Sequence, residues 1–177
     1  MESPLHLNNR DLPSDKSSKK WTARRYFIIL IIVFCIASVT RYWVRAYKVP
    51  SVSMEPTIQK DDQIVAVRVF ESQILKRGDI VIFPLPTDRK KDFVKRIVGL
   101  SGEKLEIRKQ QVFINDQALE EPYAMHTEPP TPKPSPRDDF GPKMIPDDYV
   151  FVLGDNRENS LDSRQFGLIQ IKDISRK

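Results

Sequence analysis

The sequence of 177 residues contains one cysteine and two histidines. The cysteine, Cys35, lies inside an apolar run, so no intramolecular disulfide can form, and cysteine usage does not indicate a cellular compartment. His6 lies in a polar tail and His126 at the edge of a proline-rich stretch. A Ser-His-Asp triad therefore has little support, and any nucleophilic serine needs a different base.

The chain also lacks a recognition motif for nucleic acids. Its formal net charge is +5, but the basic residues are spread along the chain. Neither a basic patch interleaved with aromatic residues nor a DNA-binding pair of helices is evident. We expect the surplus positive charge to lie near a membrane surface, and we expect no nucleic-acid partner. The chain shows no internal repeat.

One apolar run stands out, because residues 26–40, YFIILIIVFCIASVT, carry no charge. A helix that spans a bilayer needs about 20 apolar residues. Aromatic residues can act as interfacial anchors, and arginines can extend their head groups to the interface. We therefore predict a transmembrane anchor over 26–43. The flanking aromatic residues are Trp21, Tyr42, Trp43 and Tyr47, and the flanking arginines are Arg24, Arg25 and Arg41.

Two other interpretations fit this run less well. A cleaved signal peptide has a similar charge and length, but Ala37 and Val39 fit a small-x-small cleavage site poorly. A buried core helix would show a polar face, whereas this run is apolar on all faces. Residues 1–25 are expected to form a disordered, basic, cytosolic tail. The basic residues before the run slightly outnumber those after it, which places 44–177 on the extracytoplasmic side.

Residues 44–177 have the pattern of a β-rich domain. No helical stripe follows the anchor, and residues 127–142 contain six prolines, which excludes a central strand and favours a long surface loop. A polyproline ligand for a partner is the alternative for that loop. We predict an all-β, mostly antiparallel domain of sandwich or barrel type. The expected strands are 63–70, 79–83, 92–100, 104–109, 111–114, 149–153 and 168–171, with a turn at 115–116.

The stretch 50–57, PSVSMEPT, holds Ser51 and Ser53 between two prolines. Each proline fixes its own φ and restricts the residue before it, so we expect a stiff and nearly extended backbone. Taken alone, such a stretch is typical of a linker or a turn.

Two later stretches supply possible partners for a serine nucleophile. Lys95 lies in 92–99, DFVKRIVG, among apolar residues of high β-propensity. Burial disfavours the charged amine, so such a lysine can act as a general base. The third stretch is the polar block 154–164, GDNRENSLDSR, which follows the apolar run 149–153.

The three blocks, in this order and after an apolar anchor, resemble the type I signal peptidases over about residues 26–170. That family removes signal peptides from exported preproteins with a Ser/Lys dyad. The resemblance implies that Ser53 is the nucleophile and Lys95 the general base. It also implies an oxyanion hole formed by Ser51 Oγ and the Ser53 backbone N–H. Ser160 would orient Lys95, and Asp155, Arg96, Asp162 and Arg164 would support the site.

The resemblance further implies an acyl-enzyme mechanism without cofactor, and substrates with small side chains before the cut. An extended preprotein could pair with exposed strand backbone. The expected substrate-binding residues are Val49, Pro50, Asp92, Phe93 and Val94. The membrane would be a plasma membrane or a thylakoid-type membrane.

A metal site and two other functions are alternative interpretations of these residues. Asp155 and Asp162 could form a metal pair, but no Cys or His joins them and arginines lie close in sequence, so we expect ion pairs and no metal. The rival functions are a Ser/Lys autopeptidase of the repressor type and a non-catalytic, membrane-tethered β-domain. The anchor and the block 154–164 argue against the first, and the presence of both Ser53 and Lys95 argues against the second.

Overall fold

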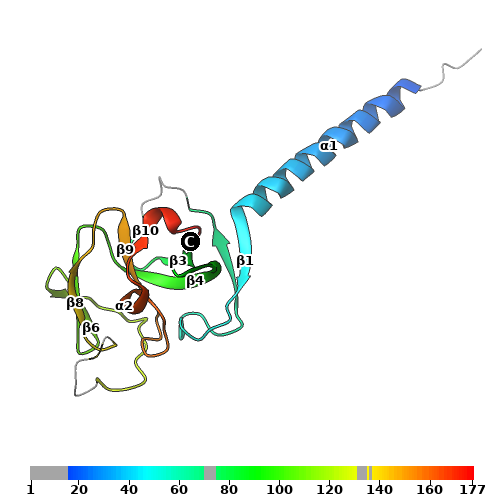
Figure 1. Cartoon of the computed structure of the whole chain (residues 1–177). Helices are drawn as coiled ribbons and strands as arrows, with labels where there is room; N and C mark the ends of the chain where they lie inside the picture. Colours follow the sequence, from blue (N-terminus) through cyan, green and yellow to red (C-terminus); the bar gives the residue numbers. More distant parts are fainter. Residues whose placement is uncertain (1–15, 70–74, 131–134, 136) are drawn as a thin grey trace, which may run out of the picture. The chain divides into compact units, whose positions relative to one another are not determined.

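The computed structural model describes residues 16–69, 75–130, 135 and 137–177. The chain divides into one unit that ends at Tyr42 and a second unit, Trp43–Lys177 (Figure 1). The predicted boundary before residue 44 lies close to this division.

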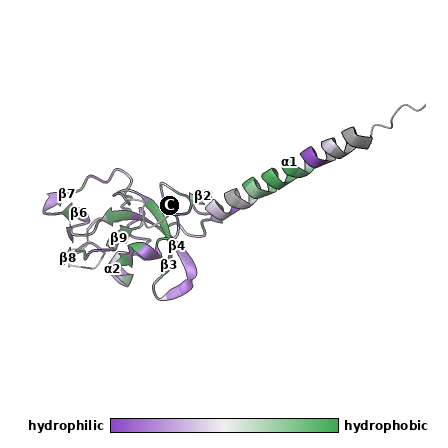
Figure 2. Ribbon diagram, turned by 90° about the horizontal axis from the view of Figure 1, so that it is seen from above, coloured by the Kyte–Doolittle hydropathy of each residue, from purple (hydrophilic) through white to green (hydrophobic). Residues whose placement is uncertain are grey.

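Helix α1 extends from Lys16 to Trp43. Its segment Arg24–Trp43 is long and apolar enough to cross a membrane, and Figure 2 shows its hydrophobic colouring. None of the described side chains of this segment is buried within the structure. The expectation of disorder is wrong for 16–25, where a stretch free of glycine and proline continues the helix. Residues 1–15 lie outside the described residues.

The second unit is built from antiparallel strands in three sheets, which confirms the all-β prediction. A two-stranded ribbon pairs β1 with β2, and two four-stranded sheets have the orders β10-β9-β4-β3 and β7-β6-β5-β8. The strands are β1 Val44–Lys48, β2 Gln63–Val67, β3 Ile80–Leu85, β4 Asp88–Gly99, β5 Lys104–Arg108, β6 Gln111–Ile114, β7 Gln117–Ala118, β8 Phe140–Met144, β9 Tyr149–Leu153 and β10 Ile169–Gln170.

Several predicted bounds need correction. Strand β2 ends at Val67, before the expected residue 70, and β4 begins at Asp88, four residues before the expected start. The proline-rich loop ends earlier than expected, because β8 begins at Phe140 and contains Pro142. Among the described strands, β8 lies at the edge of its sheet and pairs with β5 alone, and a proline is tolerated at an edge because its missing N–H breaks no ladder.

A one-turn helix, α2, spans Ser163–Phe166, and a short 3₁₀ helix, η1, spans Ile171–Asp173. Neither was predicted, because a helix of one turn is too short to show a helical stripe. The Asp162 side chain accepts a hydrogen bond from the backbone of α2, and the Gln165 side chain accepts one from the Asp162 N–H. This capping box starts α2 inside the polar block 154–164.

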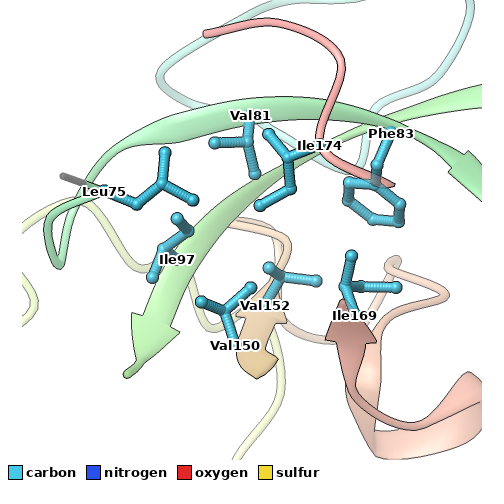
Figure 3. Close-up of a cluster of buried hydrophobic side chains, with 8 residues drawn as sticks. All are labelled: Leu75, Val81, Phe83, Ile97, Val150, Val152, Ile169 and Ile174. Carbon is cyan, nitrogen blue, oxygen red and sulfur yellow. The ribbon is translucent and has the colours of Figure 1, made fainter. Parts of the chain in front are cut away.

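Strand β4 separates two apolar cores. Successive side chains of a strand point to opposite faces, and Ile97 packs in one cluster while Val98 packs in the other. Figure 3 shows Ile97 facing the side chains of neighbouring strands and of the C-terminal segment. Lys95 lies two residues before Ile97 on the same strand, so its position in the pleat directs it toward an apolar interior. The first cluster comprises Leu75, Val81, Phe83, Ile97, Val150, Val152, Ile169 and Ile174.

Candidate active site

The segment between β1 and β2 holds Ser53 in a buried position. The Ile58 N–H donates to Met54 O at 2.9 Å and the Glu55 N–H to Val52 O at 3.1 Å, so this backbone forms turns. The expectation of a nearly extended backbone was wrong. The prolines restrict only themselves and the residues before them, whereas Met54 and Ile58 fold inward into a small apolar cluster with Val49.

Ser53 and Lys95 come into direct contact across 42 positions of the sequence. Lys95 Nζ lies 2.6 Å from Ser53 Oγ, and the two residues are 3% and 6% exposed. Ser51 Oγ lies 3.2 Å from Ser53 Oγ, so the two serine hydroxyls and the lysine amine form a continuous chain. The structure therefore brings together the three residues that the sequence placed at the centre of the site.

Burial lowers the pKa of Lys95 from 10.5 to about 8. The negative charges of Asp162 and Asp155 act in the opposite direction, and the positive charge of Arg164 assists burial. With a pKa near 8, about one lysine in ten is neutral at pH 7, against about one in three thousand for a free side chain. The site therefore supplies an amine that can accept a proton near neutral pH.

Two buried arginine–carboxylate ion pairs involve the polar block 154–164. Asp155 accepts two hydrogen bonds from Arg96, at 2.8 and 2.6 Å, and Asp162 accepts two from Arg164, at 2.9 and 2.8 Å. The hydrogen bond with Asp155 raises the pKa of Arg96 above its usual value, and burial opposes this effect without cancelling it. Both carboxylates have arginine partners, as the ion-pair interpretation expected. In the described part of the chain, no group of three or more His, Cys, Asp or Glu side chains could hold a metal.

Gly154 joins this block to the serine loop. A Cβ at this position would lie 2.2 Å from Ser160 Oγ and 2.5 Å from the Ser53 carbonyl oxygen, so only glycine fits without displacement. The Asn156 N–H donates to the same Ser53 carbonyl at 3.1 Å. Close backbone contact thus fixes the serine loop against the polar block.

Ser160 is buried beside Gly154, and its Oγ makes no hydrogen bond within the described residues. A buried hydroxyl without a partner costs stability, so the presence of Ser160 at this position calls for an explanation.

A strap formed by residues 121–127 was missed by the sequence analysis. Glu121 accepts two hydrogen bonds from Arg157, at 3.1 and 2.7 Å, and both side chains are nearly buried. The Met125 N–H donates to Asp155 O at 2.7 Å, and the Arg157 N–H donates to Met125 O at 3.0 Å. No local pattern indicates a contact between positions 36 residues apart, although the charge of Arg157 inside a polar block did call for a partner.

Two further contacts join the strap to the site. The Tyr123 ring stacks on the Arg96 guanidinium at 4.0 Å, and His126 Nδ1 lies 3.1 Å from Glu158 Oε1. Burial raises the pKa of Glu158, but hydrogen bonds from Thr127 and His126 outweigh it and hold the pKa below its usual value.

A groove of about 290 Å³ opens onto the serine and the lysine. It contains all five residues that the sequence analysis assigned to substrate binding. Asn159 and Leu161, which that analysis did not assign, also line it. The remaining lining residues are Val49, Pro50, Ser51, Ser53, Asp92, Phe93, Val94 and Lys95.

Comparison with known proteins gives consistent matches. The family model described as signal peptidase, peptidase S26, matches residues 19–177. A signal peptidase I of Bacillus amyloliquefaciens is 36% identical, with 91% of this chain and 88% of the relative covered. Signal peptidase I S of Bacillus subtilis (strain 168) is 34% identical, with 93% and 91% covered. A crystal structure of a signal peptidase I from Enterococcus faecalis V583 is 30% identical, covers 58% of this chain and 94% of its own, and has a TM-score of 0.48.

Proposed function

The chain belongs to the S26 signal peptidases and is a membrane serine endopeptidase that cleaves signal peptides; from this premise we propose that Ser53 is the nucleophile and Lys95 the general base. The observation that carries the proposal is the 2.6 Å contact between Lys95 Nζ and Ser53 Oγ at the wall of a groove. Neither rival function, the repressor-type autopeptidase or the non-catalytic domain, gains support from the comparisons.

The reaction would proceed through an acyl-enzyme. Neutral Lys95 accepts the hydroxyl proton as Ser53 Oγ forms a bond with the scissile carbonyl carbon. Ser51 Oγ and the Ser53 backbone N–H donate to the resulting oxyanion. The Lys95 ammonium then gives its proton to the leaving amine as the peptide bond breaks. Water, deprotonated by Lys95, hydrolyses the ester, and no cofactor takes part.

The remaining site residues would hold this geometry. Ser160 would orient the lysine amine from its buried position beside Gly154 at the serine loop, although among the described residues its hydroxyl makes no hydrogen bond, and so none to Lys95. The ion pairs of Arg96 with Asp155 and of Arg164 with Asp162 would fix the polar block behind the dyad.

Substrate recognition would use the two edges of the groove, Val49 and Pro50 on one segment and 92–94 on β4. An extended signal peptide would add as a strand to the backbone of 92–94. Val49 would line the groove without pairing, because its N–H donates to the Asp62 carbonyl and its own carbonyl accepts from the Asp61 N–H. Shallow apolar surface beside Ser53 favours small side chains at the first and third positions before the cut.

We propose that α1 crosses the membrane once, with residues 1–25 in the cytosol and 44–177 on the extracytoplasmic side of a plasma or thylakoid-type membrane. Protease added outside sealed cells or spheroplasts should digest 44–177 and spare the N-terminal segment. The opposite protection pattern would contradict this topology.

The dyad assignment is tested with full-length protein in detergent and a preprotein substrate. Mass spectrometry of the product should reveal one new N-terminus with the wild type and none with Ser53→Ala. Matched circular dichroism spectra would show that Ser53→Ala remains folded. Retained turnover in this variant would remove Ser53 from the mechanism.

A further inference from the structure

A second groove, of about 490 Å³, lies on the catalytic unit and is rich in cationic side chains. It is lined by β1, the residues after β2, the start of β4 and the C-terminal segment. Figure 2 shows hydrophilic residues at the beginning of β4, where the β3–β4 hairpin contributes Arg89. Two acidic residues, Asp92 and Asp173, face five basic ones, Arg45, Arg68, Arg89, Lys172 and Arg176.

The contacts inside this groove leave positive charge in excess. Arg89 pairs with Asp173 at 2.9 Å. Arg176 donates to Tyr47 Oη at 3.0 Å and to the Trp43 carbonyl at 3.3 Å; these bonds hold the guanidinium in place without neutralising it.

Two further cations of the groove are available to a ligand. Arg45 and Lys172 are exposed, and within the described residues neither forms an ion pair. A charge-rich groove of this kind favours an anion with several acceptor oxygens, because guanidinium groups bind phosphate oxygens in pairs.

The covalent chain ties this groove to the membrane surface. The candidate span ends at Trp43, and Arg45 follows two residues later. Two residues extend at most about 7 Å, so Arg45 lies within about 7 Å of the end of the span. The Trp43 carbonyl itself accepts a hydrogen bond from Arg176. If α1 crosses the bilayer as proposed above, the groove lies at the depth of the lipid headgroups.

We propose that this groove binds the phosphate headgroup of an anionic phospholipid. Arg45 and Lys172 contact the phosphate, and Arg176 presents a fixed guanidinium to it. Asp92 lines both this groove and the substrate groove, so the two adjoin. A bound headgroup therefore fixes the substrate groove at a set distance from the bilayer from which the signal peptide emerges.

The test uses full-length protein in neutral-detergent micelles that contain increasing amounts of phosphatidylglycerol or, in parallel, phosphatidylcholine. Hydrogen–deuterium exchange of β1 and of residues 171–177 reports occupancy without requiring cleavage. We expect phosphatidylglycerol alone to slow exchange in both segments. Each basic residue near an anionic surface contributes about fivefold, so Arg45→Gln/Lys172→Gln should weaken the apparent association about 25-fold.

A matched control removes the same charge elsewhere. Lys109 and Lys143 are exposed and do not line the groove. Lys109 lies in the turn between β5 and β6, and Lys143 lies in β8. The variant Lys109→Gln/Lys143→Gln should respond to phosphatidylglycerol like the wild type. Ser53→Ala should also respond normally, which separates this proposal from the catalytic one.

Several results would overturn the proposal. Equal protection of the wild type by both lipids would do so without any variant. Equal protection by inorganic phosphate would assign the groove to a free anion, and equal protection by a glutamate-rich peptide in phosphatidylcholine micelles would assign it to the polypeptide substrate. If Lys109→Gln/Lys143→Gln weakened the association with phosphatidylglycerol as much as Arg45→Gln/Lys172→Gln, the effect would be due to net charge and not to the groove.

Discussion

The two four-stranded sheets are both antiparallel and both have a closely packed apolar core, yet they differ in their buried polar residues. Strand β4 of the first sheet carries buried Lys95 and Arg96, and the block that follows β9 adds further buried charges. In the sheet β7-β6-β5-β8, the described strands bury only apolar side chains, and the buried carboxylate of Asp138 lies two residues before β8.

This difference indicates which sheet carries buried residues that stability alone would not favour. Burial of a charge costs free energy unless the charge is paired and hydrogen-bonded. The first sheet arranges arginine–carboxylate pairs around a lysine that has no carboxylate in hydrogen-bond contact among the described residues. The second sheet has the composition of a scaffold. The following predictions test this division by their effect on cleavage.

The largest effect is expected from Lys95→Met. Cleavage should be lost, because no other base contacts Ser53 Oγ among the described residues. The matched control is Lys104→Met on β5, whose amine forms a half-exposed pair with Asp116. The control should retain full cleavage of a preprotein, measured by gel shift.

Stability should change in the opposite direction. Between pH 8 and 10.5 the native state of the wild type binds fewer protons than the unfolded state. The desolvated lysine therefore lowers the free energy of unfolding. This penalty has its full size below pH 8 and fades as the pH rises to 10.5. Lys95→Met should therefore have a free energy of unfolding at pH 7 that is higher by at most about 3 kcal/mol, measured by urea titration. A Lys95→Met variant less stable than the wild type at pH 7 would contradict a desolvation penalty at Lys95.

Ser51→Ala should have the second-largest effect. Removal of one oxyanion donor lowers kcat by about a hundredfold to a thousandfold. Ser101→Ala is a suitable control, since this hydroxyl donates to the Tyr149 carbonyl away from the dyad. Single-turnover assays should give wild-type rates for Ser101→Ala. A loss in Ser51→Ala as complete as in Ser53→Ala would require a larger role for Ser51.

The pH profile should show a smaller, graded effect. The neutral amine is the working form, so kcat/KM should rise about tenfold per pH unit below pH 8 and level off above it. Ser160→Ala should reduce kcat and shift this acidic limb. His126→Gln should leave the midpoint unchanged, because His126 pairs with Glu158 and not with the dyad. A shift of the acidic limb in His126→Gln would contradict the assignment of this limb to Lys95.

The sequence allowed the prediction of local features of this site. Alternation of apolar residues predicted 111–114 to the residue, and a continuous apolar run did the same for 149–153. The three blocks led to Ser53 and Lys95. Contacts between distant segments had no such signal. The Glu121–Arg157 pair depends on tertiary packing. The turn conformation around Ser53 also depends on tertiary packing, because it buries the Met54 side chain, and burial of apolar surface stabilises the fold.

The smallest effect on cleavage is expected from Leu105→Ala in the second sheet. Leu105 is fully buried, and its truncation should lower the free energy of unfolding by about 2 to 5 kcal/mol. Cleavage per folded molecule should stay unchanged, because its cluster contains none of the site residues. Ile97→Ala is the matched variant in the first core, two residues after Lys95, and it should reduce both stability and kcat. Urea titration and active-site counting with an acylating inhibitor separate the two quantities. An equal loss of kcat in both variants would mean that the second sheet positions the dyad as directly as the first does.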